Sequence, residues 1–343
     1  MKKIKLGVLG CGRIFNKHLK AINDHRNINN FELVSICNTD KNKINKIKNP
    51  KILKFSNYKD FFEHSSNLDL ISICTPSGLH YKHCKMAAKK KKNVLVEKPL
   101  TLKFSESLEL NNIFTKKKLN LFVVKQNRFN KTLILLKKII QKNLLGKIYL
   151  VNLNVFWHRP QKYYDQDKWK GNKLLDGGAI FNQASHHIDI LNWLFGKTVQ
   201  ISCITSTLGR KIQTEDTALI NMRNNNGVLI STNVTVLSFR KNYECTMSII
   251  SEKGNVKIGG PALNKFEHLD VKNFKQIKRL FKTNRYNEKN LYKYGHEEIY
   301  EAIFMDLNKK TKKSPSSKNT IETIKLIENF HNSNKKSKHI FIK

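Results

Sequence analysis

The stretch GVLGCGRIF, residues 7–15, decides the fold of this chain. An apolar run of strand type leads into Gly10 and Gly12, and a helical pattern follows over residues 13–25. Glycines at such a junction let the backbone turn tightly and approach a pyrophosphate, which then lies at the positive end of the helix. The stretch therefore predicts a strand–turn–helix unit that binds a dinucleotide. The last position of the glycine pattern holds Phe15, which we expect to affect the packing of the helix more than binding.

Strands and helices alternate over the first 125 residues or so. Apolar runs of strand type cover residues 3–9, 31–37, 68–74, 94–96 and 121–124, and helical patterns cover residues 58–64, 80–91 and 104–117. Strands that are apolar on both faces are typical of a parallel sheet covered by helices on both sides. We therefore predict an α/β, doubly wound, dinucleotide-binding domain over residues 1–125.

The rest of the chain has a different pattern. Helical patterns cover residues 130–144, 176–195, 296–309 and 318–332, and strand patterns cover residues 146–158, 199–208, 216–223, 227–237, 243–251 and 254–258. The sequence NNNG at residues 224–227 is typical of a tight turn between antiparallel strands. Residues 126–343 are thus predicted to form a second domain of helices and strands that carries a large, mainly antiparallel open sheet.

The composition restricts the class of protein. No apolar run is long enough to span a membrane. The start, MKKIKLGVLGCG, imitates a signal peptide, but Gly7 and Gly10 interrupt its apolar part, so we expect a cytoplasmic protein. The six cysteines include no C-x-x-C pair, which predicts reduced thiols and no metal site.

The net charge of +38 has two explanations. A nucleic-acid partner would use such a charge. The lysines are scattered, however, and Asn and Ile are also abundant, which favours an A- and T-rich genome as the cause. We therefore expect no nucleic-acid partner, although an anionic ligand would still benefit from the positive field.

The second strand ends in SICNTD, where an acidic residue usually binds the adenosine ribose of NAD and repels the 2′-phosphate of NADP. This position holds Asn38, and Asp40 follows it. An asparagine offers a hydrogen bond but no charge, so we predict NAD as the cofactor without excluding NADP. Alternatively, Asn38 and Asp40 only form a turn.

Two further strand ends carry polar groups. The third strand ends in CTPSGLH, with Thr75, Pro76 and His80, and the fourth runs into Glu97 and Lys98. Ligands of open parallel sheets bind beyond the carboxyl ends of the strands. These residues are therefore predicted to line the dinucleotide site.

Together, these stretches resemble those of the Gfo/Idh/MocA oxidoreductases. The resemblance is carried by GVLGCGRI, CTPSGLH, EKPL, QNRF at 126–129 and DGGAIFNQASHHIDILNWL at 176–194. It implies an N-terminal Rossmann domain and a C-terminal α/β domain, residues 126–343, that binds substrate and whose open sheet mediates a homodimer or homotetramer. It also implies that Lys98 is an acid/base group beside the nicotinamide, that His186 is catalytic, and that the cofactor contacts are Gly10, Gly12, Arg13, Ile14, Asn38, Thr75, Pro76, His80, Glu97 and Gln126.

A polar stripe is expected on the helix near residue 186. Asn182, His186 and Asp189 are spaced i, i+4 and i+7, which places them on one helical face. Asn182 cannot ionise and should orient the substrate, and Asp189 should also contact it. Alternatively, His186 is a satisfied core histidine. Whether Lys98 or His186 is the base stays open.

The segment before this helix mixes aromatic and charged residues, among them Trp157, Arg159, Tyr163 and Tyr164. Aromatic faces stack on sugars and bases, and arginine binds phosphate in a bidentate way. The segment resembles that of dehydrogenases that oxidise the 3-hydroxyl of UDP-linked N-acetylglucosamine-type uronic acids for surface polysaccharides. Alternatively, its aromatic residues only pack.

Three functions remain. The first is an NAD-dependent dehydrogenase that oxidises a secondary hydroxyl of a sugar nucleotide. The second is an NAD(P)-dependent dehydrogenase of a free polyol or sugar, and the third is a non-catalytic dinucleotide-binding regulator. Arg159 favours the first over the second, and the presence of both Lys98 and His186 argues against the third.

Overall fold

The structure is a computed structural model that describes residues 2–284, 286, 295–309, 311–336 and 340–342. The chain divides into two compact units. Unit 1 contains Met1–Gln126 and Gly295–Ile324, and unit 2 contains Asn127–Tyr294 and Lys325–Lys343. The second domain predicted above, residues 126–343, differs from unit 2 mainly in the segment 295–324, whose helix packs on unit 1.

Unit 1 contains a parallel sheet of six strands in the order β3-β2-β1-β4-β5-β6. The strands are β1 (Ile4–Leu9), β2 (Phe31–Cys37), β3 (Leu53–Phe55), β4 (Leu70–Ile73), β5 (Asn93–Val96) and β6 (Leu121–Val123). The predicted doubly wound parallel sheet is confirmed. The sequence did not predict β3, an edge strand of three residues that buries none of them fully.

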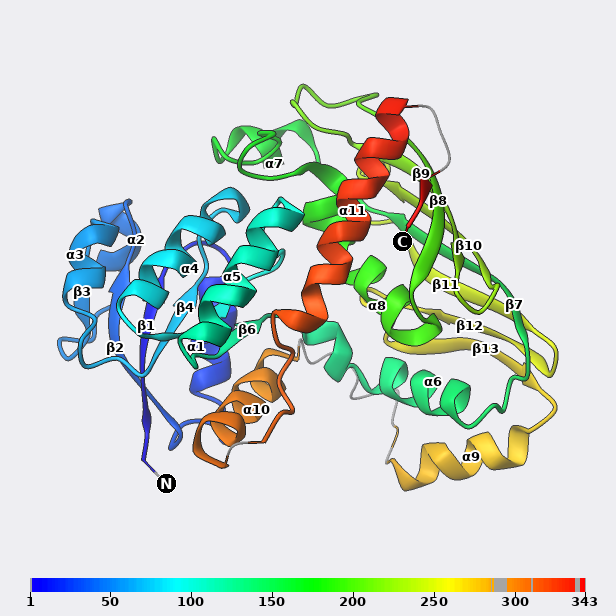
Figure 1. Ribbon diagram of the computed structural model, residues 1–343, viewed down its shortest axis with the longest axis horizontal. Coiled ribbons are helices and arrows are strands. Elements are labelled where there is room, and N and C mark those ends of the chain that lie inside the picture. The colour runs from blue at the N-terminus through cyan, green and yellow to red at the C-terminus, as the bar shows by residue number, and fades with distance from the viewer. Residues whose placement is uncertain (1, 285, 287–294, 310, 337–339, 343) are drawn as a thin grey trace. The chain divides into compact units, whose positions relative to one another are not determined.

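Helices cover both faces of this sheet (Figure 1). On one face α3 (Tyr58–Glu63), α4 (His80–Lys89) and α5 (Phe104–Lys116) pack against a core that includes Ile71, Ile73, Val94 and Val96. On the other face lie α1 (Phe15–Ile22) and α10 (His296–Lys309), which contact each other. Ser72, whose side chain points away from the first core, has its Oγ 3.4 Å from Nδ1 of His18 in α1. The short helix α2 (Lys41–Asn45) follows β2.

Unit 2 contains a sheet of eight strands in the order β13-β12-β11-β7-β10-β9-β8-β14. The strands are β7 (Ile148–Phe156), β8 (Thr198–Ser206), β9 (Thr217–Asn224), β10 (Leu229–Thr235), β11 (Glu244–Ser251), β12 (Gly254–Gly259), β13 (Lys265–Val271) and β14 (Ile340–Phe341). All neighbours are antiparallel except β7 and β10. The predicted, mainly antiparallel open sheet and its turn at residues 224–227 are confirmed.

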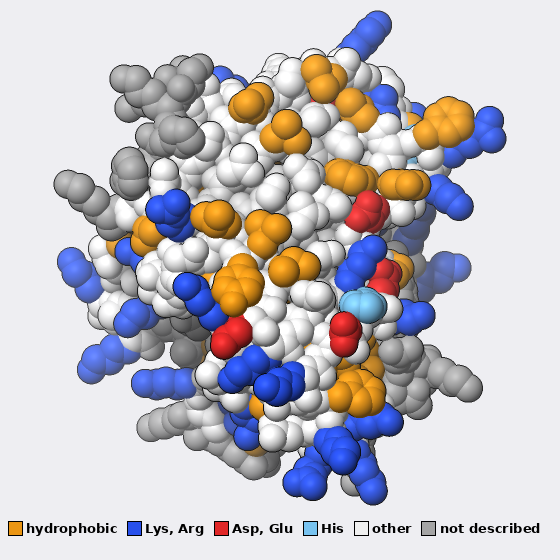
Figure 2. All heavy atoms as spheres, turned by 90° about the vertical axis from the view of Figure 1, so that its right-hand side faces the viewer, with side chains coloured by type: hydrophobic (Ala, Val, Ile, Leu, Met, Phe, Trp, Pro, Cys, Tyr) orange, Lys and Arg blue, Asp and Glu red, His pale blue; other side chains and the backbone are white. Residues whose placement is uncertain are grey.

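One face of this sheet is buried and the other carries exposed apolar side chains. The helical elements of unit 2 are α6 (Lys131–Gln141), α7 (Gln161–Asp165), a π-helix (Ala179–Ala184), α8 (Ser185–Phe195) and α9 (Phe274–Thr283), while α11 (Lys318–Lys336) begins in unit 1 and ends in unit 2. On the opposite face, hydrophobic side chains lie across the strands (Figure 2), including Leu150, Ile204, Leu219, Leu229 and Ile250.

Among the described residues, no helix is long and apolar enough to cross a membrane. All six cysteines are buried, and none is bonded to another.

Candidate functional site

The glycine turn after β1 has the shape that a pyrophosphate needs. Gly10 has φ +104°, and a Cβ there would lie 2.6 Å from the backbone carbonyl group of Cys74 at the end of β4. A Cβ on Gly12 would meet nothing within 4 Å. Gly10 thus permits two strand ends to approach, whereas Gly12 leaves open space before the first turn of α1. This open space fits a phosphate group. Phe15, at the last position of the glycine pattern, is buried in the core.

Asn38 braces this turn. Its Oδ1 accepts a hydrogen bond of 3.1 Å from the Cys11 amide, and its Nδ2 donates to the Asp40 carbonyl oxygen. The Asp40 carboxylate accepts from the Asn42 amide and caps α2. The alternative expectation, that Asn38 and Asp40 form a turn, describes these contacts. A ribose contact by Asn38 stays a prediction.

His80 connects two strand ends through the backbone. Its Nδ1 lies 2.7 Å from the Pro99 carbonyl oxygen, and its Nε2 lies 2.8 Å from the Thr75 carbonyl oxygen. Both ring nitrogens are therefore engaged by the chain itself. His80 thereby connects the ends of β4 and β5. A contact between His80 and the cofactor stays a prediction.

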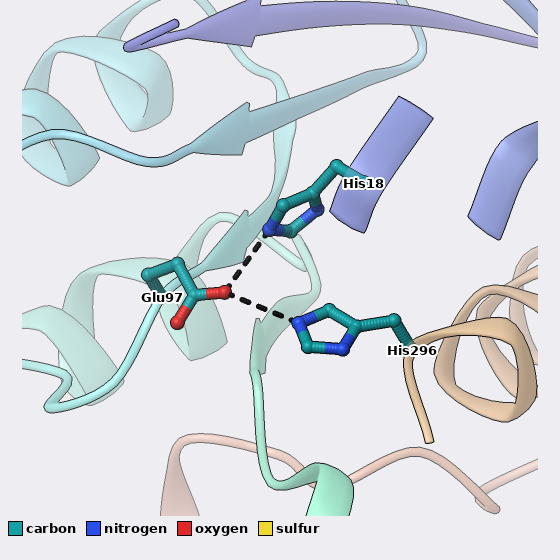
Figure 3. Close-up of side chains that lie close together, drawn as sticks. All are labelled: His18, Glu97 and His296. Carbon is teal, nitrogen blue, oxygen red and sulfur yellow. Dashed lines mark hydrogen bonds and ion pairs between the residues drawn. The ribbon is translucent and has the colours of Figure 1, made fainter. Parts of the chain in front are cut away.

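Glu97 points into the protein. Val94 and Val96 face the core under α4 and α5, and the alternation of side chains along a strand turns Glu97 toward α1 and α10. Its Oε1 lies 3.0 Å from Nε2 of His18 and 3.6 Å from Nε2 of His296 (Figure 3). Burial would raise the pKa of Glu97, but the two imidazoles hold it well below the usual value. The Glu97 carboxylate is buried beside His18. A contact between Glu97 and the cofactor stays a prediction.

The other predicted cofactor residues of unit 1 lie at the ends of its strands. Lys98 is half-buried and directly follows Glu97, whose Oε2 accepts a 3.2 Å hydrogen bond from the Lys98 amide. The expected contacts Arg13 and Ile14 lie between Gly12 and α1, Pro76 precedes a 3₁₀ turn at Ser77–Leu79, and Gln126 begins a second one at Gln126–Phe129. Their contacts with a cofactor stay predictions.

The expected helix at residues 176–195 contains a π-helix. Asn182 lies in the π-helix, and His186 and Asp189 lie in α8. Asn182 and His186 are half-buried, whereas the residues between them are buried, so these two share the less covered face. The prediction of a regular α-helix over 179–184 was wrong. π-Helical turns occur often at functional sites.

Glu215 explains this irregular turn. Its backbone carbonyl accepts from the Ala179 amide, and its Oε1 accepts a 2.9 Å hydrogen bond from the Ile180 amide. A Cβ on Gly178, which has φ +92°, would lie 2.3 Å from Glu215 Oε2. Burial, with smaller contributions from Asp176 and Asp216, raises the pKa of Glu215 to about 7. A buried carboxyl group therefore supports the segment that carries Asn182.

We predict a pH effect from Glu215. Between about pH 4.5 and pH 7 the unfolded chain loses this proton while the folded protein retains it, so the free energy of unfolding falls as pH rises. The shift corresponds to about 3 kcal/mol. Glu215→Gln should remove this decrease and be more stable than the wild type at pH 8. Urea unfolding at pH 5 and 8 measures it, with the exposed Glu32→Gln as control. Equal pH slopes in wild type and Glu215→Gln would contradict the assignment.

Asp189 is paired inside unit 2. Its two carboxylate oxygens accept hydrogen bonds of 2.8 Å each from Nε and one terminal nitrogen of Arg128. The Asp189 side chain is 2% exposed and that of Arg128 is 15% exposed. This bidentate salt bridge holds α8. Direct substrate contact by Asp189 stays a prediction.

Asn182 is also held by a carboxylate. Its Nδ2 donates to Oδ1 of Asp176, while Oδ2 of Asp176 accepts a 2.7 Å hydrogen bond from the Gly171 amide. These contacts orient the Asn182 amide group. A role for Asn182 in orienting the substrate stays a prediction.

Cations and aromatic rings gather in the segment after β7. The Arg159 guanidinium carbon lies 5.0 Å from the centre of the Trp157 ring and 5.6 Å from that of Tyr163. The ammonium group of Lys170 lies 4.1 Å from the Tyr163 ring. Tyr164 is buried and packs edge-on against Tyr163, 5.1 Å between ring centres. Trp157, Arg159 and Tyr163 are thus half-buried groups suited to an anionic, planar ligand, and Tyr164 supports them.

Comparison with known families covers both units. Residues 4–125 match the family described as "Oxidoreductase family, NAD-binding Rossmann fold", and residues 133–257 match the "GFO/IDH/MocA C-terminal domain". The chain belongs to the Gfo/Idh/MocA oxidoreductase family. It therefore has an NAD-binding Rossmann domain and is an NAD(P)-dependent oxidoreductase that acts on CH–OH groups.

Two solved structures of this family are similar over the full length of the chain. The WlbA dehydrogenase from Bordetella pertussis, in complex with NADH and UDP-GlcNAcA, is 33% identical, with a TM-score of 0.94 over 100% of this chain and 98% of that one. The WlbA dehydrogenase from Chromobacterium violaceum, with the same ligands, is 32% identical, with a TM-score of 0.91 over 100% and 97%. An uncharacterized oxidoreductase of Synechocystis, sll0816, is 24% identical over 77% of this chain and 74% of its own.

Several residues that shape this Gfo/Idh/MocA site were missed in the sequence. His18, His296 and Glu215 gave no signal, because their partners lie far away along the chain. Arg128 and Asp176 fell inside the stretches QNRF and DGGAIFNQ but were not singled out. Their position within these stretches was the signal that could have identified them.

Proposed function

We propose that this protein oxidises the 3-hydroxyl of a UDP-linked N-acetylhexosamine or its uronic acid with NAD, in the synthesis of surface-polysaccharide precursors. The observation that carries the proposal is the similarity, at 33% identity over the whole chain, to a dehydrogenase crystallised with NADH and UDP-GlcNAcA. The Arg159 cluster of cations and aromatic rings supports it, because such a substrate carries a diphosphate and a carboxylate.

NAD is proposed as the cofactor. The open space at Gly12 and the start of α1 would receive the pyrophosphate. Asn38 carries no charge, so we expect NAD to bind more tightly than NADP but only modestly so. A bound NAD would supply the hydride acceptor for oxidation of the secondary alcohol.

The chain's own residues would handle the proton. We propose that Lys98 or His186 removes it from the hydroxyl group, and that the same residue returns it in the reverse reaction. A lysine base must be neutral when it acts, whereas the usual pKa of histidine already suits this task. Asn182, oriented by Asp176, would bind the substrate without ionising.

A substrate panel tests the proposal. The purified protein is incubated with UDP-N-acetyl sugars, their uronic acids, free glucose and inositol, with NAD or NADP, and the absorbance of the reduced nicotinamide is followed. We expect the highest kcat/KM for a UDP-linked uronic acid with NAD. Higher activity on a free polyol than on every UDP-sugar would refute the substrate class, and a preference for NADP would refute the cofactor.

Arg159→Ala should raise the KM for the UDP-sugar about tenfold or more, because a charge-assisted contact with an anion is lost. Turnover at saturation should change little, since the phosphates are remote from the reacting carbon. Steady-state kinetics measures both quantities, with Arg279→Ala, an exposed arginine of α9, as the matched control. An unchanged KM would remove Arg159 from the substrate site.

We also propose that a second copy of the chain covers the apolar face of the eight-stranded sheet. Leu219 and Ile204 face each other across β9 and β8 on this face, and Leu150 lies between Leu229 and Ile250. A homodimer or homotetramer would bury these rows. Sedimentation of the wild type and of Leu219→Asp tests this: the variant should dissociate, and a monomeric wild type would refute it. Cytoplasmic location stays a prediction.

A further inference from the structure

Three residues from distant parts of the chain meet inside unit 1. His18 comes from α1, Glu97 follows β5, and His296 is the first residue of α10 (Figure 3). They are 1%, 8% and 4% exposed, respectively. Each offers one atom that can bind a metal, and these three atoms lie within 4.8 Å of one another.

His296 is the member of this cluster with unsatisfied polar atoms among the described residues. Within the described part of the chain, neither of its buried ring nitrogens makes a hydrogen bond. Its Nε2 points at Glu97 Oε1 from 3.6 Å, which is too far for a hydrogen bond. Buried polar atoms are nearly always satisfied, and an exception calls for a water or an ion. An ion between Nε2 of His296 and the carboxylate would satisfy this nitrogen and Oε1 of Glu97.

His18 is already oriented as a metal ligand. Its Nδ1 is hydrogen-bonded to the Tyr300 hydroxyl at 2.8 Å, while its Nε2 faces Glu97. Histidines that bind metals typically engage their second nitrogen in this way. Tyr300 itself is fully buried, so the orientation of His18 is fixed by packing.

The spacing of the donor atoms also fits. Ligand bonds of 2.0–2.2 Å in a tetrahedral zinc site place donor atoms about 3.3–3.6 Å apart. Of the two distances from Glu97 Oε1, 3.6 Å lies at the upper end of this range and 3.0 Å lies slightly below it. Two imidazoles and one carboxylate form a donor set that zinc accepts and that magnesium and calcium do not prefer.

We propose that His18, Glu97 and His296 form a binding site for a divalent transition-metal ion of the zinc class. The ion replaces the proton between His18 and Glu97 and joins the first helix, the end of β5 and the start of α10. It thereby fixes the peptide that carries Lys98. The sequence predicted no metal site, because no short spacing connects these three residues.

The first experiment uses the tag-free full chain after removal of metals with a chelator. Titration with Zn²⁺ should show one ion per chain by calorimetry and metal analysis, and the Tm should rise, because the ion binds the folded state. Co²⁺ should give the visible absorption bands of a four-coordinate site. A stripped protein that binds neither metal at one ion per chain would overturn the proposal.

Variants locate the ion. His296→Gln should abolish stoichiometric binding, and Tyr300→Phe should weaken it about 10–100-fold, because the partner of His18 Nδ1 is lost. His25→Gln, an exposed histidine of unit 1, is the control and should bind as the wild type does. Wild-type affinity in His296→Gln would overturn the proposal and leave a hydrogen-bonded triad. If His296→Gln does not fold, the Tyr300→Phe affinity and the cobalt spectrum decide.

Discussion

Replacing Lys98 with alanine should lower turnover about 10²–10⁴-fold, the usual effect of losing one positioned acid/base group. Lys98 follows the buried Glu97 at the carboxyl end of β5, and Pro99 succeeds it. Its backbone amide donates to Glu97 Oε2, and His80 holds the Pro99 carbonyl oxygen. The backbone at Lys98 is therefore fixed on both sides.

The experiment must separate chemistry from binding. Turnover with the best substrate of the panel measures the chemical step, and calorimetry with NAD measures cofactor binding. NAD affinity should change little in Lys98→Ala, because the glycine turn at Gly10 and Gly12 is untouched. Lys103→Ala, an exposed lysine nearby in the sequence, is the matched control. Near-normal turnover in Lys98→Ala would leave His186 as the base and make Lys98 structural.

Replacing Asp189 with alanine should lower the free energy of unfolding by about 3–5 kcal/mol, because it leaves the charge of Arg128 without its partner in a largely buried place. Both hydrogen bonds of the pair are 2.8 Å long and bidentate, which is the strong geometry for this pair of groups. Urea unfolding measures the loss.

A double variant separates the lost charge pair from the lost packing. Arg128→Met with Asp189→Leu removes both charges and fills the space, so it should recover most of the stability that Asp189→Ala loses. Asp189→Asn keeps the shape of the side chain, so its free energy of unfolding should lie between those of Asp189→Ala and the double variant. A loss below about 1 kcal/mol in Asp189→Ala would show that the pair behaves as an exposed salt bridge.

The pattern of apolar residues by itself determined the two kinds of sheet. Runs such as Val94–Val96, apolar on both faces and separated by helical patterns, required a parallel sheet with two covering layers. The alternating pattern of β9 and the turn at residues 224–227 required an antiparallel pair. These signals are local, because strand and helix periodicity depends on neighbouring residues.

The sequence analysis missed several elements, and two of them, β13 (Lys265–Val271) and the amphipathic α9 (Phe274–Thr283), are long enough to carry a periodic signal. Other missed elements lack such periodicity. β3 is short and α2 has five residues, one of them buried, so neither has an apolar face long enough to be recognised. The π-helix was predicted as an α-helix, because the spacing of its residues follows the helical pattern of the longer segment 176–195. Glu215, more than thirty residues later in the chain, accepts the hydrogen bonds from its first turn.

In the candidate site, too, the local sequence determined some features and the tertiary structure decided others. The sequence placed Glu97 and Lys98 at the end of a strand, and alternation along β5 already turned Glu97 away from the side of Val96. Which groups meet Glu97 was decided by tertiary structure, because α1 and α10 pack on that face and bring His18 and His296 to its carboxylate. Arg128 reaches Asp189 in the same way. Helix packing joins residues that no local spacing relates, so these partners became visible only in the folded chain.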